Sequence, residues 1–393
     1  MGRGWNRALP EPPTQAIAIP SPDSCLLPTF YLFPSPQTSL KQIAGSPVIS
    51  PGARIPRRLT DHLMNYRRNA LILLTTVAAA AALNAATEET LAKKFTAASG
   101  GKLVVDVDFG AIEVTTTADN EVSIDVYRKV GLKSEEAEKK YLAERPVTFQ
   151  RDGDTVTVRS RKAGKSSWNW SWGGQKLEGK YIVHVPAKFN VKLNTSGGHI
   201  MVSDLTGEVK ADTSGGSLKF ARIHGPINGD TSGGSIHLTD CDGTLKVDTS
   251  GGGIESTGGS GSLHADTSGG GITVKNFAGP AHLDTSGGGI KVENVTGAVD
   301  ASTSGGSISA RFSAPLGGAV KLDTSGGGIT VAVPANAAFD LDADTSAGSV
   351  SCDLPITIVG KKERDHLKGA VNGGGVKVAL DTSAGSIHVL KLD

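Results

Sequence analysis

Aspartate recurs at one place in a five-residue motif, Asp-Thr-Ser-Gly-Gly, and is the residue whose spacing could most readily support chemistry. If the copies stack as strands, their carboxylates form a column with a spacing of about 4.8 Å, and each pair repels by about 1 kcal/mol even in water. Such a column could bind calcium. Its members are Asp212, Asp230, Asp248, Asp266, Asp284, Asp323, Asp344 and Asp381.

A structural role for these aspartates is favoured over calcium binding. Calcium β-rolls are built from glycine-rich nonapeptides with aspartate inside the turn, whereas here isoleucine follows Gly-Gly after one residue. An aspartate before such a turn can instead accept hydrogen bonds from the turn amides. Lysines two positions earlier would relieve the repulsion in several copies; these are Lys192, Lys210, Lys246 and Lys321.

Two histidines accompany the column. His264, Asp266, His282 and Asp284 are expected to cluster on one outer face, and imidazole together with carboxylate is a donor set for transition metals. A surface histidine at a repeat position is more often a polar filler, and no residue pattern indicates supporting hydrogen bonds behind a metal ligand. We therefore predict no metal and no cofactor from the sequence.

Three tryptophans, Trp168, Trp170 and Trp172, occupy alternate positions. In a strand they would share one face and could form a platform for a sugar or a protein partner. They could equally cover an apolar end of a repeat stack. The sequence leaves both interpretations open.

The near-identity of the repeats argues against catalysis. Acid–base catalysis needs neighbouring groups whose pKa values are pushed apart, whereas each repeat gives its aspartate the same surroundings. Polysaccharide lyases and hydrolases with a β-helix fold use longer and irregular coils, and they are the enzyme alternative. We predict no catalytic residues.

The motif recurs in steps of 18 residues from Asn194 to Ser302, followed by steps of 21, 21 and 37 residues. Each step holds two short alternating runs separated by Gly-Gly and Thr-Gly, which predicts two strands and two turns per coil. The fold class is therefore all-β, a single-stranded parallel β-helix or β-solenoid with 18-residue coils. The alternation places the motif threonine inward and the aspartate outward, and we expect the longer steps to bulge as loops.

The second motif glycine is present in all ten copies, whereas the first is replaced in two copies by Ala347 and Ala384. The second position is thus predicted either to need a positive φ or to have no room for a Cβ atom. These structural turn residues are Gly198, Gly216, Gly234, Gly252, Gly270, Gly288, Gly306, Gly327, Gly348 and Gly385.

Four segments are predicted along the chain. Residues 1–63 are Pro-rich and show no apolar periodicity, which predicts disorder. Residues 64–85 have a basic start, a short apolar run and then small residues, as in a signal peptide. We therefore predict that translation starts at Met64 and that the mature protein has its amino terminus near Ala86. Residues 86–190 form a β-rich part with one helix from Ser134 to Glu144, and residues 191–393 form the regular repeats.

Composition narrows the class of protein further. The formal net charge of +1 gives no basic surface for nucleic acid. Three cysteines, Cys25, Cys241 and Cys352, are too few and too scattered for a disulfide framework or a zinc site, so we expect free thiols in the mature chain. The apolar run before Ala86 is too short to serve as a comfortable transmembrane anchor.

From Phe95 to Asp393 the sequence resembles the bacterial putative-adhesin β-strand repeat proteins, known as domain of unknown function 4097. The resemblance rests on Phe109-Gly-Ala-Ile-Glu-Val114, on Val185-Pro186 before the first coil, and on the Thr-Ser-Gly-Gly-x-Ile turns. It implies an extracytoplasmic single-stranded β-helix and supplies no catalytic residues.

Together these features predict an exported, non-catalytic β-solenoid that acts as an adhesin or as a structural or binding protein of the cell envelope. Its location would be the periplasm, the cell surface or the medium, and its partner an envelope polysaccharide or protein. A carbohydrate-active β-helix enzyme and an envelope-stress regulatory domain are the alternatives.

Overall fold

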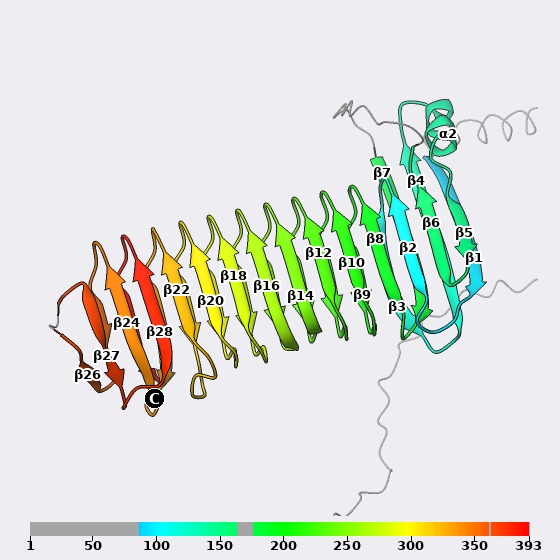
Figure 1. Cartoon of the computed structure of the whole chain (residues 1–393). Coiled ribbons are helices and arrows are strands. Elements are labelled where there is room, and N and C mark those ends of the chain that lie inside the picture. Colours follow the sequence, from blue (N-terminus) through cyan, green and yellow to red (C-terminus); the bar gives the residue numbers. More distant parts are fainter. Residues whose placement is uncertain (1–85, 163–175, 361–362, 393) are drawn as a thin grey trace, which may run out of the picture. The chain divides into compact units, whose positions relative to one another are not determined.

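The computed structural model describes residues 86–162, 176–360 and 363–392. These residues form two long sheets and one short helix, which confirms the predicted all-β solenoid (Figure 1). The Pro-rich segment, the predicted signal peptide and the three clustered tryptophans lie outside the described residues.

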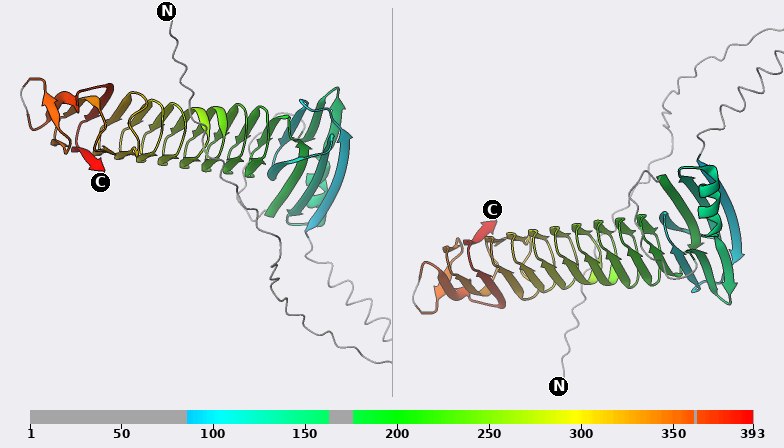
Figure 2. Two further views of the ribbon diagram at one scale, coloured as in Figure 1. Left: turned by 90° about the horizontal axis from the view of Figure 1, so that it is seen from below. Right: turned by 90° about the horizontal axis from the view of Figure 1, so that it is seen from above.

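Each coil of the central part contributes one strand to each sheet, and its turns line up along the two edges of the stack (Figure 2). In the 15-stranded sheet these strands are β8 (Asn190–Thr195), β10 (Val209–Thr213), β12 (Ile227–Thr231), β14 (Asp242–Thr249), β16 (Ser260–Thr267), β18 (Ala281–Thr285), β20 (Val299–Thr303) and β22 (Val320–Thr324). In the 14-stranded sheet they are β9 (Ile200–Ser203), β11 (Leu218–Ala221), β13 (Ile236–Thr239), β15 (Ile254–Thr257), β17 (Ile272–Lys275), β19 (Ile290–Glu293), β21 (Ile308–Arg311) and β23 (Ile329–Pro334).

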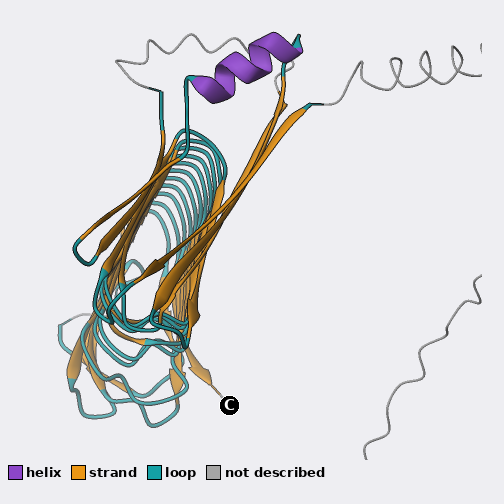
Figure 3. Ribbon diagram, turned by 90° about the vertical axis from the view of Figure 1, so that its right-hand side faces the viewer, coloured by secondary structure: helices purple, strands orange, loops and turns teal. Residues whose placement is uncertain are grey.

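The strands of neighbouring coils pair in parallel and in register, so that equivalent residues lie beside each other. In β10, Val209, Ala211 and Thr213 are buried between the sheets while Lys210 and Asp212 face outward. The predicted inward threonine and outward aspartate are therefore confirmed. The core is a set of apolar columns between the two sheets. The view along the stack shows the strands of the two sheets facing each other (Figure 3).

The motif turn is built around one backbone carbonyl of the neighbouring coil. The Thr249 hydroxyl donates to the Gly234 carbonyl oxygen at 2.8 Å and accepts from the Gly252 amide at 3.4 Å. A Cβ atom on Gly252 would overlap that same carbonyl oxygen, and Gly252 has no positive φ. Of the two predicted reasons for this glycine, the lack of room is confirmed and the positive φ is wrong.

Left-handed backbone occurs instead at the opposite turn, the one that contains Thr-Gly. Gly225 there has a φ of 149°, and a non-glycine residue such as Asn276 has a φ of 54°. Glycine and asparagine tolerate this conformation better than other residue types. In the regular coils from β8 to β19, the residues with a positive φ thus lie at the turn away from the motif.

At the amino-terminal end the stacking order departs from the chain order. The coil made of β2 (Lys102–Val107) and β3 (Ala111–Thr117) lies between β8/β9 and a further coil made of β6 (Thr155–Ser160) and β7 (Lys176–Pro186). Antiparallel strands finish both sheets: β5 (Thr148–Asp152), β4 (Glu121–Gly131) and β1 (Thr87–Thr96).

The predicted helix is confirmed as α2 (Glu135–Ala143) at this end of the stack (Figure 3). Its N-cap is Ser134, whose side chain accepts from the Ala137 amide, and acidic residues in the first turn suit the positive end of the helix dipole. Beside it, the buried Arg128 guanidinium donates to Glu89, to the Arg145 carbonyl and to other groups. This network joins β1, β4 and the chain after α2.

At the other end, β28 (Val376–Thr382) and β29 (Ile387–Leu392) are inserted between β22/β23 and the coil of β24 (Phe339–Thr345) and β25 (Val350–Cys352). The long step before Asp381 does not bulge as a loop, so that expectation is wrong. Its residues form β26 (Ile356–Ile358) and β27 (His366–Val371), which pair antiparallel and close the sheet beside β24. The closing strands shield an edge that would otherwise be open.

Candidate ligand-binding face

The outer face of the 15-stranded sheet carries an unbroken row of motif aspartates. Register pairing places one carboxylate beside the next through five successive coils, and a second row of three follows at the far end. The first row is Asp212, Asp230, Asp248, Asp266 and Asp284; the second is Asp323, Asp381 and Asp344, in that spatial order. The aspartate column predicted from the repeat therefore exists, but its second row does not follow the chain order.

In each row, partial burial and crowding change the acidity of one inner member. Partial burial, followed by the charges of Asp248 and Asp212, raises the pKa of Asp230 above its ordinary value. Partial burial followed by the charges of Asp323 and Asp344 raises the pKa of Asp381 in the same way. The rows therefore attract cations.

The expectation that the aspartates accept hydrogen bonds from the turn amides is wrong among the residues that the structure describes. The amide of Gly233 donates to the Ser214 carbonyl of the neighbouring coil at 3.1 Å, and the amide of Gly252 donates to Thr249. The stacked backbone and the threonine hydroxyl already satisfy the turn. The carboxylates remain available to solvent or to a ligand.

Of the four lysines expected to relieve the row, Lys246 pairs with a motif aspartate, with its Nζ atom 3.8 Å from Asp248. Lys210 instead lies 2.7 Å from Glu208, and Lys321 lies 3.5 Å from Asp300. These exposed pairs contribute little stability. Among these three lysines, only Lys246 therefore relieves the repulsion within the aspartate row, and it does so at Asp248.

The two histidines stack on each other at the middle of the first row. The rings of His264 and His282 are nearly parallel, with centroids 4.9 Å apart. The Nε2 atom of His282 lies 2.8 Å from Asp284, and its Nδ1 atom lies 3.5 Å from Asp300. The predicted cluster is confirmed, and His282 is engaged by carboxylates on both nitrogens.

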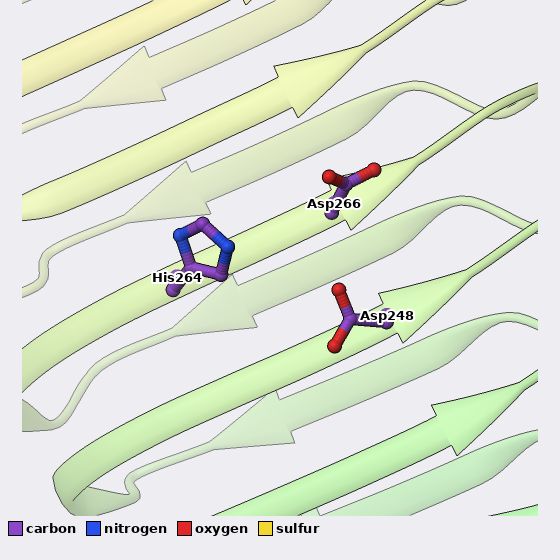
Figure 4. A group of neighbouring side chains, drawn as sticks. All are labelled: Asp248, His264 and Asp266. Carbon is purple, nitrogen blue, oxygen red and sulfur yellow. The ribbon is translucent and has the colours of Figure 1, made fainter.

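His264 faces two motif aspartates from adjacent coils. One donor atom from each of Asp248, His264 and Asp266 lies within 4.8 Å of the other two (Figure 4). The sequence grouped His264 with its own strand neighbour Asp266 but did not include Asp248. That residue joins the cluster because β14 and β16 pair in register.

A groove of about 540 Å³ runs along the same face over five coils, β14 to β22. One row of its lining is short side chains: Thr244, Ser262, Pro280, Ala298 and Ala319. The next row is longer and polar: Lys246, His264, His282, Asp300 and Lys321. Four steps of about 4.8 Å give it a length of about 19 Å. The recurrence of small residues at one repeat position was the signal in the sequence that could have revealed it.

Two further hollows continue this face. One of about 460 Å³ is lined by Arg161, Lys192 and Lys210 together with polar residues of the first coils. The other, of about 440 Å³, follows the motif turns and is lined by aspartate, threonine and serine from Asp212 to Ser268. The face is thus hollowed over much of its length and mixes both signs of charge.

A family model described as Toastrack DUF4097 matches residues 101–390. The chain belongs to the Toastrack family. This confirms the resemblance found in the repeat. No curated protein matches the chain.

Several solved structures are similar to this Toastrack chain. They include a putative adhesin from Bacteroides fragilis, with 15% identity over 77% of this chain and 97% of that chain and a TM-score of 0.29. A putative adhesin from Parabacteroides distasonis has 14% identity over 76% and 97% of the two chains and a TM-score of 0.38. A putative lipid binding protein from the same species has 13% identity over 77% and 97%, with a TM-score of 0.37. At this level of similarity no function follows from them.

Two sequence-based predictions for the Toastrack chain concern other regions. The segment with Trp168, Trp170 and Trp172 lies outside the described residues; along the chain it connects β6 to β7. Its role as a platform or a cap stays a prediction.

Cys241 is buried, Cys352 is half-buried, and both are free thiols. In the described ranges no helix is long and apolar enough to cross a membrane.

Proposed function

We propose that this protein is an exported, non-catalytic binding protein of the cell envelope, of the adhesin type, which holds an extended envelope polysaccharide on the outer face of the 15-stranded sheet. The groove over β14 to β22 is the observation that carries the proposal. It is long, open and straight, as an extended polymer requires, and it repeats similar contacts coil after coil.

The lining chemistry supports a polysaccharide as the ligand. Short side chains such as Pro280, Ala298 and Ala319 offer an apolar strip on which the faces of sugar rings can lie. The polar row beside it, with His282 and Asp300, offers donors and acceptors for hydroxyl groups.

The repeated surroundings of the carboxylates support a non-catalytic role. In both rows the raised pKa of an inner aspartate has the same cause, which is partial burial between two like neighbours. A general acid and its partner base would instead have contrasting surroundings.

Export is proposed from the sequence alone. Arg67 and Arg68, the apolar run from Ala70 to Leu83 and the small residues after it are typical of a secretory signal peptide. The final location would be the periplasm, the cell surface or the medium.

The test is affinity electrophoresis of the full chain through gels that contain purified bacterial envelope polysaccharides, together with sedimentation on insoluble peptidoglycan. Ala298→Arg fills the middle of the groove and is expected to weaken binding at least about tenfold, because a bulky side chain on the strip blocks the polymer. Ser309→Arg on β21 adds the same side chain to the opposite face of the same coil and is expected to leave binding unchanged.

Equal affinity of the two arginine variants, or no retardation by any polysaccharide tested, contradicts the proposal. Shortening of a bound polysaccharide over time would favour the enzyme alternative instead.

A further inference from the structure

We propose that Asp248, His264 and Asp266 bind one divalent transition-metal ion, with zinc as the best match. The site lies on the outer face of β14 and β16, where the groove meets the hollow along the motif turns. It goes beyond the proposed function, because it requires only the metal and these three side chains.

The donor atoms already converge. One oxygen from each carboxylate and one ring nitrogen of His264 lie within 4.8 Å of one another (Figure 4). Ligands 2.0–2.2 Å from a tetrahedral zinc ion lie about 3.4 Å apart. Small side-chain rotations at this solvent-exposed face close the difference, and the remaining coordination position is open to water.

His264 is free to act as a ligand. Within the described ranges, neither of its ring nitrogens has a hydrogen-bond or ion-pair partner, whereas both nitrogens of His282 face carboxylates. The stacked ring of His282 orients the imidazole of His264, with an angle of 7° between the two ring planes. The pair therefore divides into one engaged histidine and one available histidine.

The surrounding charges favour a cation at this point. Asp248 and Asp266 are register partners in a row of carboxylates that repel one another, so a metal ion between them removes an unfavourable contact. The Lys246 ammonium, 3.8 Å from Asp248, is the local competitor. Replacing this lysine should therefore tighten the metal site.

The donor set also selects the class of ion. Imidazole with carboxylates suits zinc and its first-row neighbours. Calcium takes six to eight oxygen ligands, and this cluster supplies two carboxylates and a nitrogen. Calcium is thus expected to compete poorly.

The experiment is titration of the full chain, without any histidine tag, with Co²⁺ followed by visible absorption and with Zn²⁺ followed by calorimetry. We expect one ion per chain, loss of that site in His264→Ala, and at least about tenfold weaker binding in Asp266→Asn. Lys246→Ala should bind several-fold more tightly than the parent, and millimolar Ca²⁺ should not displace Co²⁺.

Two matched controls use groups outside the cluster. Asp212→Asn removes a carboxylate two coils away from Asp248 in the same row, and His237→Ala removes a partly exposed histidine from the opposite sheet; both should bind like the parent. The circular dichroism spectrum and melting curve of every variant are compared with those of the parent, so that a loss of binding is assigned only to a folded protein.

Absence of saturable binding, undiminished binding in His264→Ala, or equal competition by Ca²⁺ would overturn the metal site. The groove variant Ala298→Arg should keep the metal ion while losing the polysaccharide. A negative polysaccharide assay therefore does not contradict the metal site, and a negative metal titration does not contradict polysaccharide binding in the groove.

Discussion

A single carbonyl oxygen explains two residues of the motif. The Gly234 carbonyl receives the Thr249 hydroxyl and occupies the space that a Cβ atom on Gly252 would need. Both residues therefore depend on the neighbouring coil as well as on the hydrogen bond between them within their own turn. The first glycine has no such constraint, because a Cβ atom on Gly251 would lie 3.5 Å from its nearest neighbour.

This difference predicts a contrast between two alanine variants. Gly252→Ala should lower the free energy of unfolding by about 2 kcal/mol or more, because the added methyl group forces the stacked backbones apart. Gly251→Ala should stay within about 0.5 kcal/mol of the parent. Urea unfolding at constant slope measures both, and coinciding midpoints for the two variants would be incompatible with the close approach at Gly252.

At the residue scale, comparison of the repeats predicted which glycine matters but not why. The group that fills the space belongs to the neighbouring coil, so the turn sequence alone could not decide between left-handed backbone and lack of room. Asp248 was missed beside His264 for the same reason. Its proximity depends on the pairing of β14 with β16, whereas Asp266 is on the same strand as His264.

At the scale of the strand and sheet, the stacking of the coils places the aspartates of successive motif copies side by side, in a row of like charges. The pKa of Asp230, usually 3.8, is raised by partial burial and by the charges of its neighbours, so the folded protein binds its proton more tightly than the unfolded chain does. By linkage, this residue lowers stability above its folded pKa, and the penalty disappears as the pH falls below 3.8.

We therefore predict that Asp230→Asn is more stable than the parent at pH 7, by on the order of 0.5 kcal/mol. The difference should shrink as the pH is lowered and should vanish near pH 3, where the parent carboxyl is neutral in both states. Thermal or urea unfolding across this pH range is the measurement. A constant difference at all pH values would show that charge is not its cause.

Asp242 provides the opposite case on the same strand as Asp248. The Ser260 hydroxyl lowers the pKa of this carboxyl, with a further contribution from His224. Its stabilising effect is present above the usual value of 3.8 and is lost as the pH falls through the lower folded pKa. Asp242→Asn should therefore destabilise at neutral pH, which makes it the control for Asp230→Asn.

The regular strands could be predicted from the sequence, whereas β26 and β27, which close the sheet, could not. The period of the motif and the alternation of apolar residues determine the coils from β8 to β23, and the parity of each strand could be predicted. Residues 353–372 interrupt the period, and without a period their pairing depends on contacts with β24 that a local pattern does not encode. The groove was missed because its floor consists of small residues, which carry no chemical signal individually.

At the scale of the whole described unit, both ends of the stack place coils out of chain order. β28 pairs with β22 on one side and with β24 on the other, so it has two neighbours although β24 precedes it in sequence. β26 pairs only with β27 at the edge of the sheet. The protection of a strand's backbone amides from exchange with solvent should therefore depend on how many strands it pairs with, and not on its position along the chain.

Native-state hydrogen exchange tests this arrangement. Amides in β28 are expected to exchange at least about tenfold more slowly than those in β26, because opening β28 requires breaking two ladders. β22, which also has a ladder on each side, is the reference strand and should resemble β28. Faster exchange in β28 than in β26 would mean that the inserted coil is wrongly placed.

The inserted coil also affects how the protein is made. A ribosome produces β22, then β24, and only later the strand that lies between them. Until residues 376–382 have been made, β24 lacks the parallel partner, β28, that joins it to β22 in the final sheet. Either β24 stays unpaired on that side, or any pairing it makes with β22 must break before β28 can enter. The amino-terminal coils can thus assemble during synthesis, whereas the far end closes only after its last strands have been made, so we expect that end to be the last part of the stack to fold.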